Sequence, residues 1–246
     1  MLALEHPRRG EPAPSALTMR DRQLRHSHDE PAVPLPPRGV SATRVALAIL
    51  ILVAVIATTA DAASRTSINP FNFFGYFTIQ SNLMMATMWL GIGTAGLLQR
   101  SSSSFTDHLR GFVTTYIAVV GVVYAVLLAP LGAAGGVPLP WANVVLHIVV
   151  PVVACLDWIA VPDRRPLLWS RLVLVLIYPL VWLSVVLVRG ATDGWVPYPF
   201  LDPARGYGAV TLTSLAIAAA TVAFGALVFL LSRIRFQRKL HSHRAE

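Results

Sequence analysis

The chain has 246 residues, of which 55% are hydrophobic and only 13% are charged, and its formal net charge is +8. A soluble domain carries about a quarter charged residues, so this composition indicates a membrane protein rather than a soluble enzyme. The net charge does not indicate nucleic-acid binding, because no basic patch is interleaved with aromatic residues. The single cysteine, Cys155, excludes an internal disulfide and a thiolate metal cluster within one chain.

The N-terminal segment, residues 1–42, combines many prolines with charges of both signs and little apolar periodicity. Such a sequence buries too little apolar surface to offset the entropy lost on ordering. We therefore predict a disordered cytoplasmic tail. The basic segment 233–246 is predicted to form a second cytoplasmic tail.

Six apolar segments follow, and each is long enough to cross the roughly 30 Å hydrocarbon layer as a helix. Backbone groups inside lipid need internal partners, so helices are expected throughout. The prediction is an all-α membrane protein with one transmembrane domain over residues 43–232. Its six helices are expected at 43–63, 73–98, 108–130, 141–161, 167–188 and 209–232.

The first apolar segment has an alternative interpretation. Together with "TTADAAS" at 58–64, it resembles a signal peptide with an A-x-A cleavage site. The polar region before it, residues 1–42, is much longer than such signals carry. We therefore expect the first helix to be retained.

The flanking charges predict the orientation, because cytoplasmic loops are enriched in arginine and lysine. From Arg38 onward, twelve of these residues lie on the side of the two tails, whereas the other side holds only Arg65, Arg189 and Arg205. Both termini are therefore predicted to be cytoplasmic. Lys239 is the only lysine, which is typical of a GC-rich bacterial genome. We expect a multi-pass protein of a bacterial plasma membrane.

Polar residues gather near the predicted outer ends of the second and fourth helices. In this topology Thr78 and His147 both lie roughly 8–9 Å below the outer helix ends. Asn82 is one turn from Thr78, and Asn143 is one turn from His147. A lone threonine commonly bonds to the preceding turn and a lone asparagine commonly joins helices. An intramembrane histidine indicates function, so we predict a polar pocket in the outer leaflet.

The outer loop "RGATDGWVPYPFLDPARGYG" at 189–208 is rich in aromatic residues. One interpretation is an interfacial aromatic belt. The other is a lid over the predicted pocket, formed by Trp195, Tyr198 and Phe200.

The residue inventory restricts the chemistry. His147 is the only histidine in the predicted interior, which excludes a bis-histidine haem and a zinc site of three or four ligands within one chain. "GIGTAG" at 91–96 follows no strand, so it indicates close helix packing rather than phosphate binding. A hydroxyl and an imidazole at one depth favour nucleophilic acyl transfer, with Thr78 as nucleophile and no cofactor.

Three segments carry a family resemblance: "FNFFGYFTIQSNL", "WANVVLHIVVP" and "VRGATDGWVPYPFLDP". In this order they resemble the androgen-induced, androgen-dependent tissue-factor-pathway-inhibitor-regulating family, and more closely its bacterial relatives, the Pr-six-Pr integral membrane proteins. The resemblance covers about 45–230. Animal members are transmembrane threonine hydrolases of fatty acid esters of hydroxy fatty acids. Their nucleophile matches Thr78 and their catalytic histidine matches His147, which implies a long-chain acyl ester as substrate.

The sequence defines less clearly which groups would assist Thr78 and His147 in the reaction. Asn82 is a candidate oxyanion donor, and Ser81 lies beside it. Asp61, Asp202 and Asn143 are candidates for orienting His147. Asp157 lies ten residues further along the same predicted helix, roughly 15 Å away, and cannot orient that imidazole.

A non-enzymatic alternative stays open. The chain would then be a carrier that uses His147 as a protonatable gate, or a packing scaffold. The absence of an internal repeat, and of a second intramembrane charge near His147, argues against a carrier.

Overall fold

The structure, a computed structural model, describes residues 33–242, with side chains described up to Arg233 apart from those of 133 and 134. The described residues form one compact unit. The predicted disordered tail lies outside the described residues for positions 1–32. Residues 33–37 have no regular secondary structure, and the first described helix begins at Arg38, five residues before its expected start.

The described residues are helical and contain no strand, which confirms the predicted all-α class. The longer helices alternate with short 3₁₀ and π-helical turns. In chain order the elements are α2 (Arg38–Arg65), α3 (Pro70–Phe73), α4 (Phe77–Leu97), α5 (Ser104–Val123), η1 (Tyr124–Leu128), η2 (Ala129–Gly135), α6 (Pro140–Val144), η3 (Val145–Val149), α7 (Val150–Ala160), η4 (Trp169–Leu176), α8 (Ile177–Thr192), η5 (Pro199–Leu201), η6 (Pro203–Arg205) and α9 (Tyr207–Ser242).

Five of these helical segments are long and apolar enough to cross a membrane: Arg38–Arg65, Ser104–Gly132, Pro140–Ala160, Trp169–Thr192 and Tyr207–Arg233. The described part of the chain therefore indicates a multi-pass membrane protein. The remaining predicted span, 73–98, is broken before Phe77, where α4 begins. The polar side chains in the first turns of α4 lower its hydropathy, so this helix is not one of the five.

Local sequence explains where several helices begin and bend. Ser103 caps α5, because its hydroxyl accepts a hydrogen bond from the Thr106 amide at 3.1 Å. Pro151 removes a backbone donor from the fourth predicted span, because proline has no N–H. The π-helical turn η3 ends at Val149, two residues before this proline. A π turn absorbs such a disruption while the helix continues.

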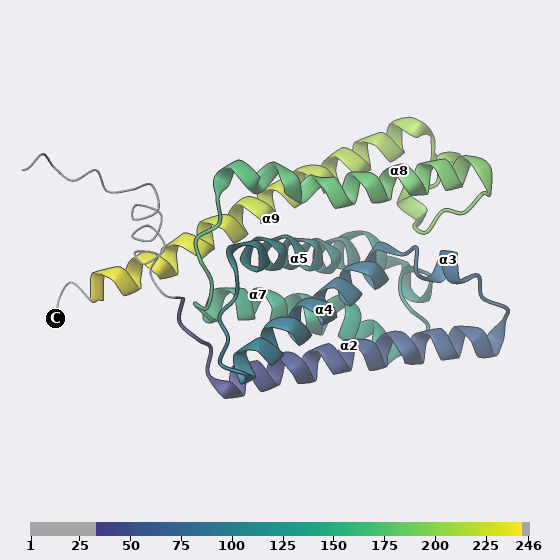
Figure 1. Cartoon of the computed structure of the whole chain (residues 1–246). Coiled ribbons are helices and arrows are strands. Elements are labelled where there is room, and N and C mark those ends of the chain that lie inside the picture. Colours follow the sequence, from purple (N-terminus) through teal and green to yellow (C-terminus); the bar gives the residue numbers. More distant parts are fainter. Residues whose placement is uncertain (1–32, 243–246) are drawn as a thin grey trace, which may run out of the picture. The chain divides into compact units, whose positions relative to one another are not determined.

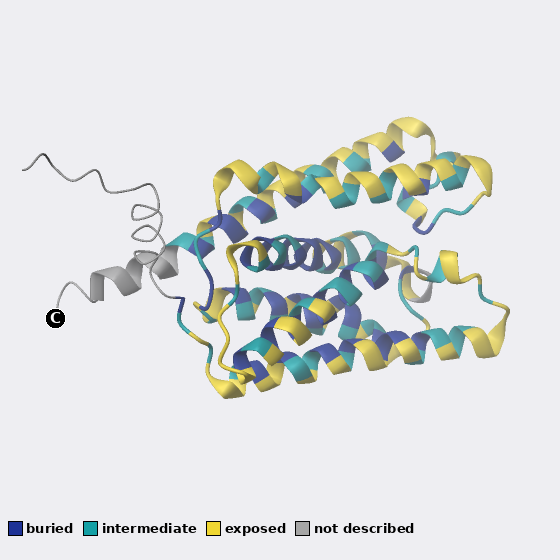
Figure 2. Ribbon diagram, viewed as in Figure 1, coloured by how far each residue is buried: buried dark blue, intermediate teal, exposed yellow. Residues whose placement is uncertain are grey.

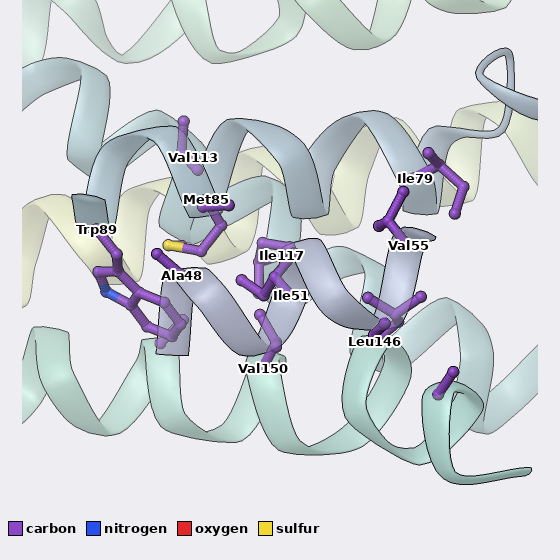
Figure 3. Packing of buried hydrophobic residues seen from close by; sticks show 14 of the residues in the cluster. Ala48, Ile51, Val55, Ile79, Met85, Trp89, Val113, Ile117, Leu146 and Val150 are labelled. Carbon is purple, nitrogen blue, oxygen red and sulfur yellow. The ribbon is translucent and has the colours of Figure 1, made fainter. Parts of the chain in front are cut away.

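α5 is the central helix of the described bundle, and most of its residues are buried (Figures 1 and 2). It contacts α4, α7 and α9, while α2 packs along α4. Figure 3 shows the main core, where Ile51 of α2, Met85 of α4, Ile117 of α5 and Val150 of α7 meet. α8 and α9 expose large apolar residues, such as Val181 and Leu212. Such faces suit lipid.

Two arginines and two aspartates form a buried charge cluster at the end of the bundle opposite α3. Arg44 of α2 and Arg110 of α5 each bind both Asp157 of α7 and Asp163 of the following loop. The four charges sum to zero, and each carboxylate accepts from both guanidinium groups. Burial alone would raise the pKa of Asp163, but the charges and hydrogen bonds of the two arginines hold it below its ordinary value.

Three arginines that flank the predicted spans, two of them in this cluster, are buried. Arg44, Arg110 and Arg164 are only 1%, 3% and 3% exposed. Arg164 stacks on the Trp158 ring at 3.8 Å. The guanidinium groups of Arg44 and Arg110 both reach Asp157 of α7, so these two arginines do more than flank the predicted spans.

Candidate functional site

The candidate nucleophile, Thr78, is the second residue of α4 and is 7% exposed. Its backbone amide donates a hydrogen bond to the hydroxyl of Tyr198 at 3.2 Å, and its Oγ1 lies 3.4 Å from the same hydroxyl. The first amides of a helix lack intrahelical acceptors, and no side chain at the N-cap, Tyr76, supplies one. Tyr198, from the outer loop, therefore caps α4 from a distance of 120 residues in sequence.

A cavity of about 420 Å³ opens beside Thr78. Its walls come from α5, α8, α9 and the outer loop, and they are mainly aliphatic and aromatic, as in Val120, Leu183 and Val210. A few hydroxyl groups, including those of Thr78 and Tyr198, interrupt this lining. Mostly apolar pockets with few polar groups are typical of small-molecule sites. An acyl chain with an oxygen function near Thr78 matches this distribution.

The aromatic residues of the outer loop lie at this cavity. Tyr198 and Phe200 line it and stack on each other, with ring centroids 5.1 Å apart. Trp195 does not line it; its ring lies edge-on to Tyr76 and under the Arg189 guanidinium. Two of the three predicted lid residues, Tyr198 and Phe200, therefore form part of the cavity wall. The third, Trp195, holds the loop in place through its contacts with Tyr76 and Arg189.

The candidate base, His147, lies in the π-helical turn η3 and is 4% exposed. Its Nδ1 lies 3.2 Å from the carbonyl oxygen of Asn143. A carbonyl only accepts, so Nδ1 carries the proton and the neutral ring presents Nε2 as an acceptor. The ring also stacks on Tyr124, with centroids 4.3 Å apart. A backbone carbonyl and an aromatic ring thus orient the imidazole.

The side chain of Asn143 has a different task from the one predicted. Its Nδ2 donates to the Tyr124 hydroxyl at 2.6 Å, and its Oδ1 accepts from the Val137 amide at 3.2 Å. Asn143 therefore orients His147 through its backbone and positions Tyr124 through its side chain. Tyr124 and His147 both lie in π-helical turns, which are frequent at functional sites.

The two candidate carboxylates have partners elsewhere. Asp61 binds Arg65 at 2.8 Å, one turn along α2. Asp202 caps the short η6 turn by accepting from the Ala204 amide. Neither hydrogen-bonds to His147 in the part of the chain that the structure describes.

Asn82 joins the two halves of the candidate site. Its fully buried Nδ2 donates to the Thr78 carbonyl at 2.9 Å and to the Leu146 carbonyl at 3.2 Å. Both amide hydrogens are therefore used, and the predicted role as an oxyanion donor has no free donor in this arrangement. Ser81, the neighbouring candidate, is fully buried.

Thr78 and His147 thus occupy one neighbourhood without touching. A single amide nitrogen reaches the carbonyl of Thr78 and the carbonyl just before His147. Within residues 33–242, however, no hydrogen bond joins their side chains, and His147 does not line the 420 Å³ cavity. The Thr78 hydroxyl is instead beside Tyr198.

The other polar groups near residues 71–85 dock α8. Tyr178 donates to Gln80 at 2.9 Å, Trp182 donates to the Gly75 carbonyl at 2.8 Å, and Arg189 donates to Asn72 at 2.6 Å. These bonds explain why a segment at the mouth of an apolar helix carries so many polar residues. Sequence reasoning missed the partners, although the aromatic and basic residues of one face of α8 were the available signal.

Among the described residues, no three His, Cys, Asp or Glu side chains gather in a way that would hold a metal ion. Comparison with protein-family models, curated proteins and solved structures found no match. The resemblance to the Pr-six-Pr proteins rests on the three sequence segments alone.

Proposed function

We propose that this chain hydrolyses esters of long acyl chains within a bacterial plasma membrane, with Thr78 as nucleophile and His147 as base. The observation that carries the proposal is the position of the Thr78 hydroxyl in the wall of a mainly apolar cavity. The family resemblance supports the same residues. The animal members suggest a fatty acid ester of a hydroxy fatty acid as the type of substrate.

The proposed topology has six spans with both termini cytoplasmic. α4 supplies the sixth span, because its 21 residues measure about 30 Å at 1.5 Å per residue. The alternation of arginine and lysine supports the orientation. In this frame the cavity lies in the outer leaflet, between α5, α8 and α9. The exposed apolar faces of α8 and α9 suit lateral entry of a lipid.

The reaction begins when the Thr78 side chain turns from Tyr198 toward His147. Helical threonine populates two χ1 rotamers, so its hydroxyl can leave Tyr198 by a change of rotamer. Nε2 of His147 takes the hydroxyl proton as Oγ1 bonds to the ester carbon. The bond to the alcohol oxygen then breaks, and that oxygen takes the proton from His147. Water, deprotonated by His147, releases the fatty acid and restores Thr78.

A second candidate function is that of a non-enzymatic scaffold. The observation that favours it is the use of Gln80, Asn72 and Asn82 in bonds between helices and loops, which is a packing role. This candidate predicts an unreactive Thr78.

Labelling with a lipophilic fluorophosphonate separates the two, because the reagent marks an activated hydroxyl covalently. The full chain should label, and Thr78→Ala should not. Thr87→Ala is the matched control, because Thr87 lies on α4, outside the cavity, and donates to the Leu83 carbonyl. Equal labelling of Thr78→Ala and the unaltered chain would contradict the hydrolase.

A further inference from the structure

The hydroxyl and the backbone amide of the candidate nucleophile both contact an outer-loop tyrosine. The Tyr198 hydroxyl accepts a hydrogen bond from the Thr78 amide at 3.2 Å and lies 3.4 Å from Oγ1. Its side chain is 8% exposed and reaches the same cavity as Thr78. Because its oxygen already accepts from an amide, its own hydrogen is free to point toward Oγ1 or the cavity.

We propose that Tyr198 is a catalytic residue of this site, whose phenol donates a hydrogen bond to the ester carbonyl oxygen as negative charge develops there. This inference rests on the proposed hydrolase function. When Oγ1 bonds to the carbonyl carbon, the π electron pair moves to the carbonyl oxygen, which is bonded to the same carbon. Tyr198 lines the same cavity as Thr78 and its oxygen is bound to the Thr78 backbone amide, so its O–H can reach a carbonyl oxygen that lies beside Thr78.

The other groups near Thr78 leave this role open. The amide hydrogens of Asn82 are both bound to backbone carbonyls. The imidazole of His147 presents an acceptor and is occupied with the proton of Thr78. The Thr78 amide, at the positive end of α4, already donates to the Tyr198 oxygen and so leaves the phenol O–H as the available donor.

The environment keeps the phenol protonated and in place. Burial raises the pKa of Tyr198 to about 12, so its hydroxyl donates at any physiological pH instead of acting as a base. Its ring is held between Phe200, stacked at 5.1 Å, and Trp182 at 5.9 Å. A fixed donor needs little reorganisation when the charge forms.

Tyr198→Phe tests this assignment in the full chain reconstituted in detergent, with para-nitrophenyl laurate as substrate. Loss of one oxyanion donor costs about 10²-fold in kcat, and KM should stay within about threefold. Tyr76→Phe is the matched control, because the Tyr76 ring lies edge-on to Tyr198 at 5.6 Å and its hydroxyl makes no hydrogen bond in the described chain. This control should keep the unaltered kcat.

Thr78→Ala, assayed in parallel, separates the two proposals. Suppose that Thr78→Ala is inactive and that folded Tyr198→Phe has the kcat of the unaltered chain. Tyr198 is then only a helix cap, and the proposed hydrolase function is retained. If Thr78→Ala is fully active, the hydrolase itself fails.

A second measurement applies if Tyr198→Phe does not fold. 3-Fluorotyrosine at position 198 keeps the size and the hydrogen bond but has a more acidic phenol. The alkaline limit of kcat should then move to lower pH. A structural cap predicts an unchanged pH profile, and that result would overturn the proposal.

Discussion

Arg110 of α5 donates a hydrogen bond of 2.6 Å to Asp163 of the loop after α7, although 53 residues separate them in sequence. The same guanidinium binds Asp157 at 2.9 Å, and Arg44 of α2 binds both carboxylates as well. Three helices and a loop are therefore joined by one neutral cluster. Removing one member of the cluster leaves a buried charge unpaired, so such a substitution should strongly lower the stability of the fold.

Asp163→Asn should destabilise the protein by about 3 kcal/mol, because Arg44 and Arg110 would keep their charges with one carboxylate fewer. Thermal unfolding of the purified full chain in detergent measures the effect. Asp61→Asn is the matched control, since its partner Arg65 is largely exposed and such pairs contribute less than about 1 kcal/mol. Equal losses in the two variants would contradict a special role for the cluster.

The same carboxylate predicts an acid dependence. The pKa of Asp163 in the folded protein is below its ordinary value of 3.8. Its contribution to stability is therefore complete above about pH 5 and is lost as the pH falls through the lower folded-state value. The difference in unfolding temperature between the unaltered chain and Asp163→Asn should shrink below pH 4. If the difference in unfolding temperature stayed constant down to pH 2, the ionised carboxylate of Asp163 would not be the form that stabilises the protein.

Glycines in "GIGTAG" provide a test of packing. A Cβ added at Gly93 would lie 2.9 Å from the Ser41 backbone carbonyl of α2, whereas one added at Gly91 meets nothing within 4 Å. Gly93→Ala should push α2 from α4 and lower the unfolding temperature. Gly91→Ala should be neutral or stabilising, because alanine favours helices. A larger loss at Gly91 than at Gly93 would contradict the packing of these helices.

The proposed orientation predicts which cysteines are accessible. In a Cys155→Ala background, Thr192→Cys should react with an impermeant thiol reagent added to intact cells, and Ser101→Cys should react only after lysis. Both positions are exposed in the structure, so burial does not mask either. Reaction of Ser101→Cys in intact cells would reverse the topology and move the cavity to the inner leaflet.

The sequence predicted the helical class well, because long apolar runs have few alternatives inside lipid. The start of α4 was predicted less well. Phe73 ends one short helix and Phe77 begins another, and both are apolar, so hydropathy does not mark the break. The buried pairing of Arg44 and Arg110 was not predicted for a related reason: the sequence of a buried, paired arginine does not differ from that of an exposed flanking arginine until the partner helix is placed.

The candidate site shows the same limit. Spacing along each helix predicts that Asn82 shares a face with Thr78, and Asn143 with His147. It does not predict that Asn143 acts on His147 through its backbone, nor that Tyr198 is the nearest hydroxyl to Thr78. Those contacts depend on π-helical turns and on a loop 120 residues away, which local patterns do not encode.

The most direct test of the hydrolase is kcat/KM for a long-chain ester in Thr78→Ala, His147→Ala and the double variant. Each single substitution should abolish activity, and the double variant should be little worse, because residues that act together are non-additive. Thr78→Ser should keep part of the activity. Equal unfolding temperatures are required for the comparison. A folded Thr78→Ala that hydrolyses the ester at the rate of the unaltered chain would contradict the mechanism.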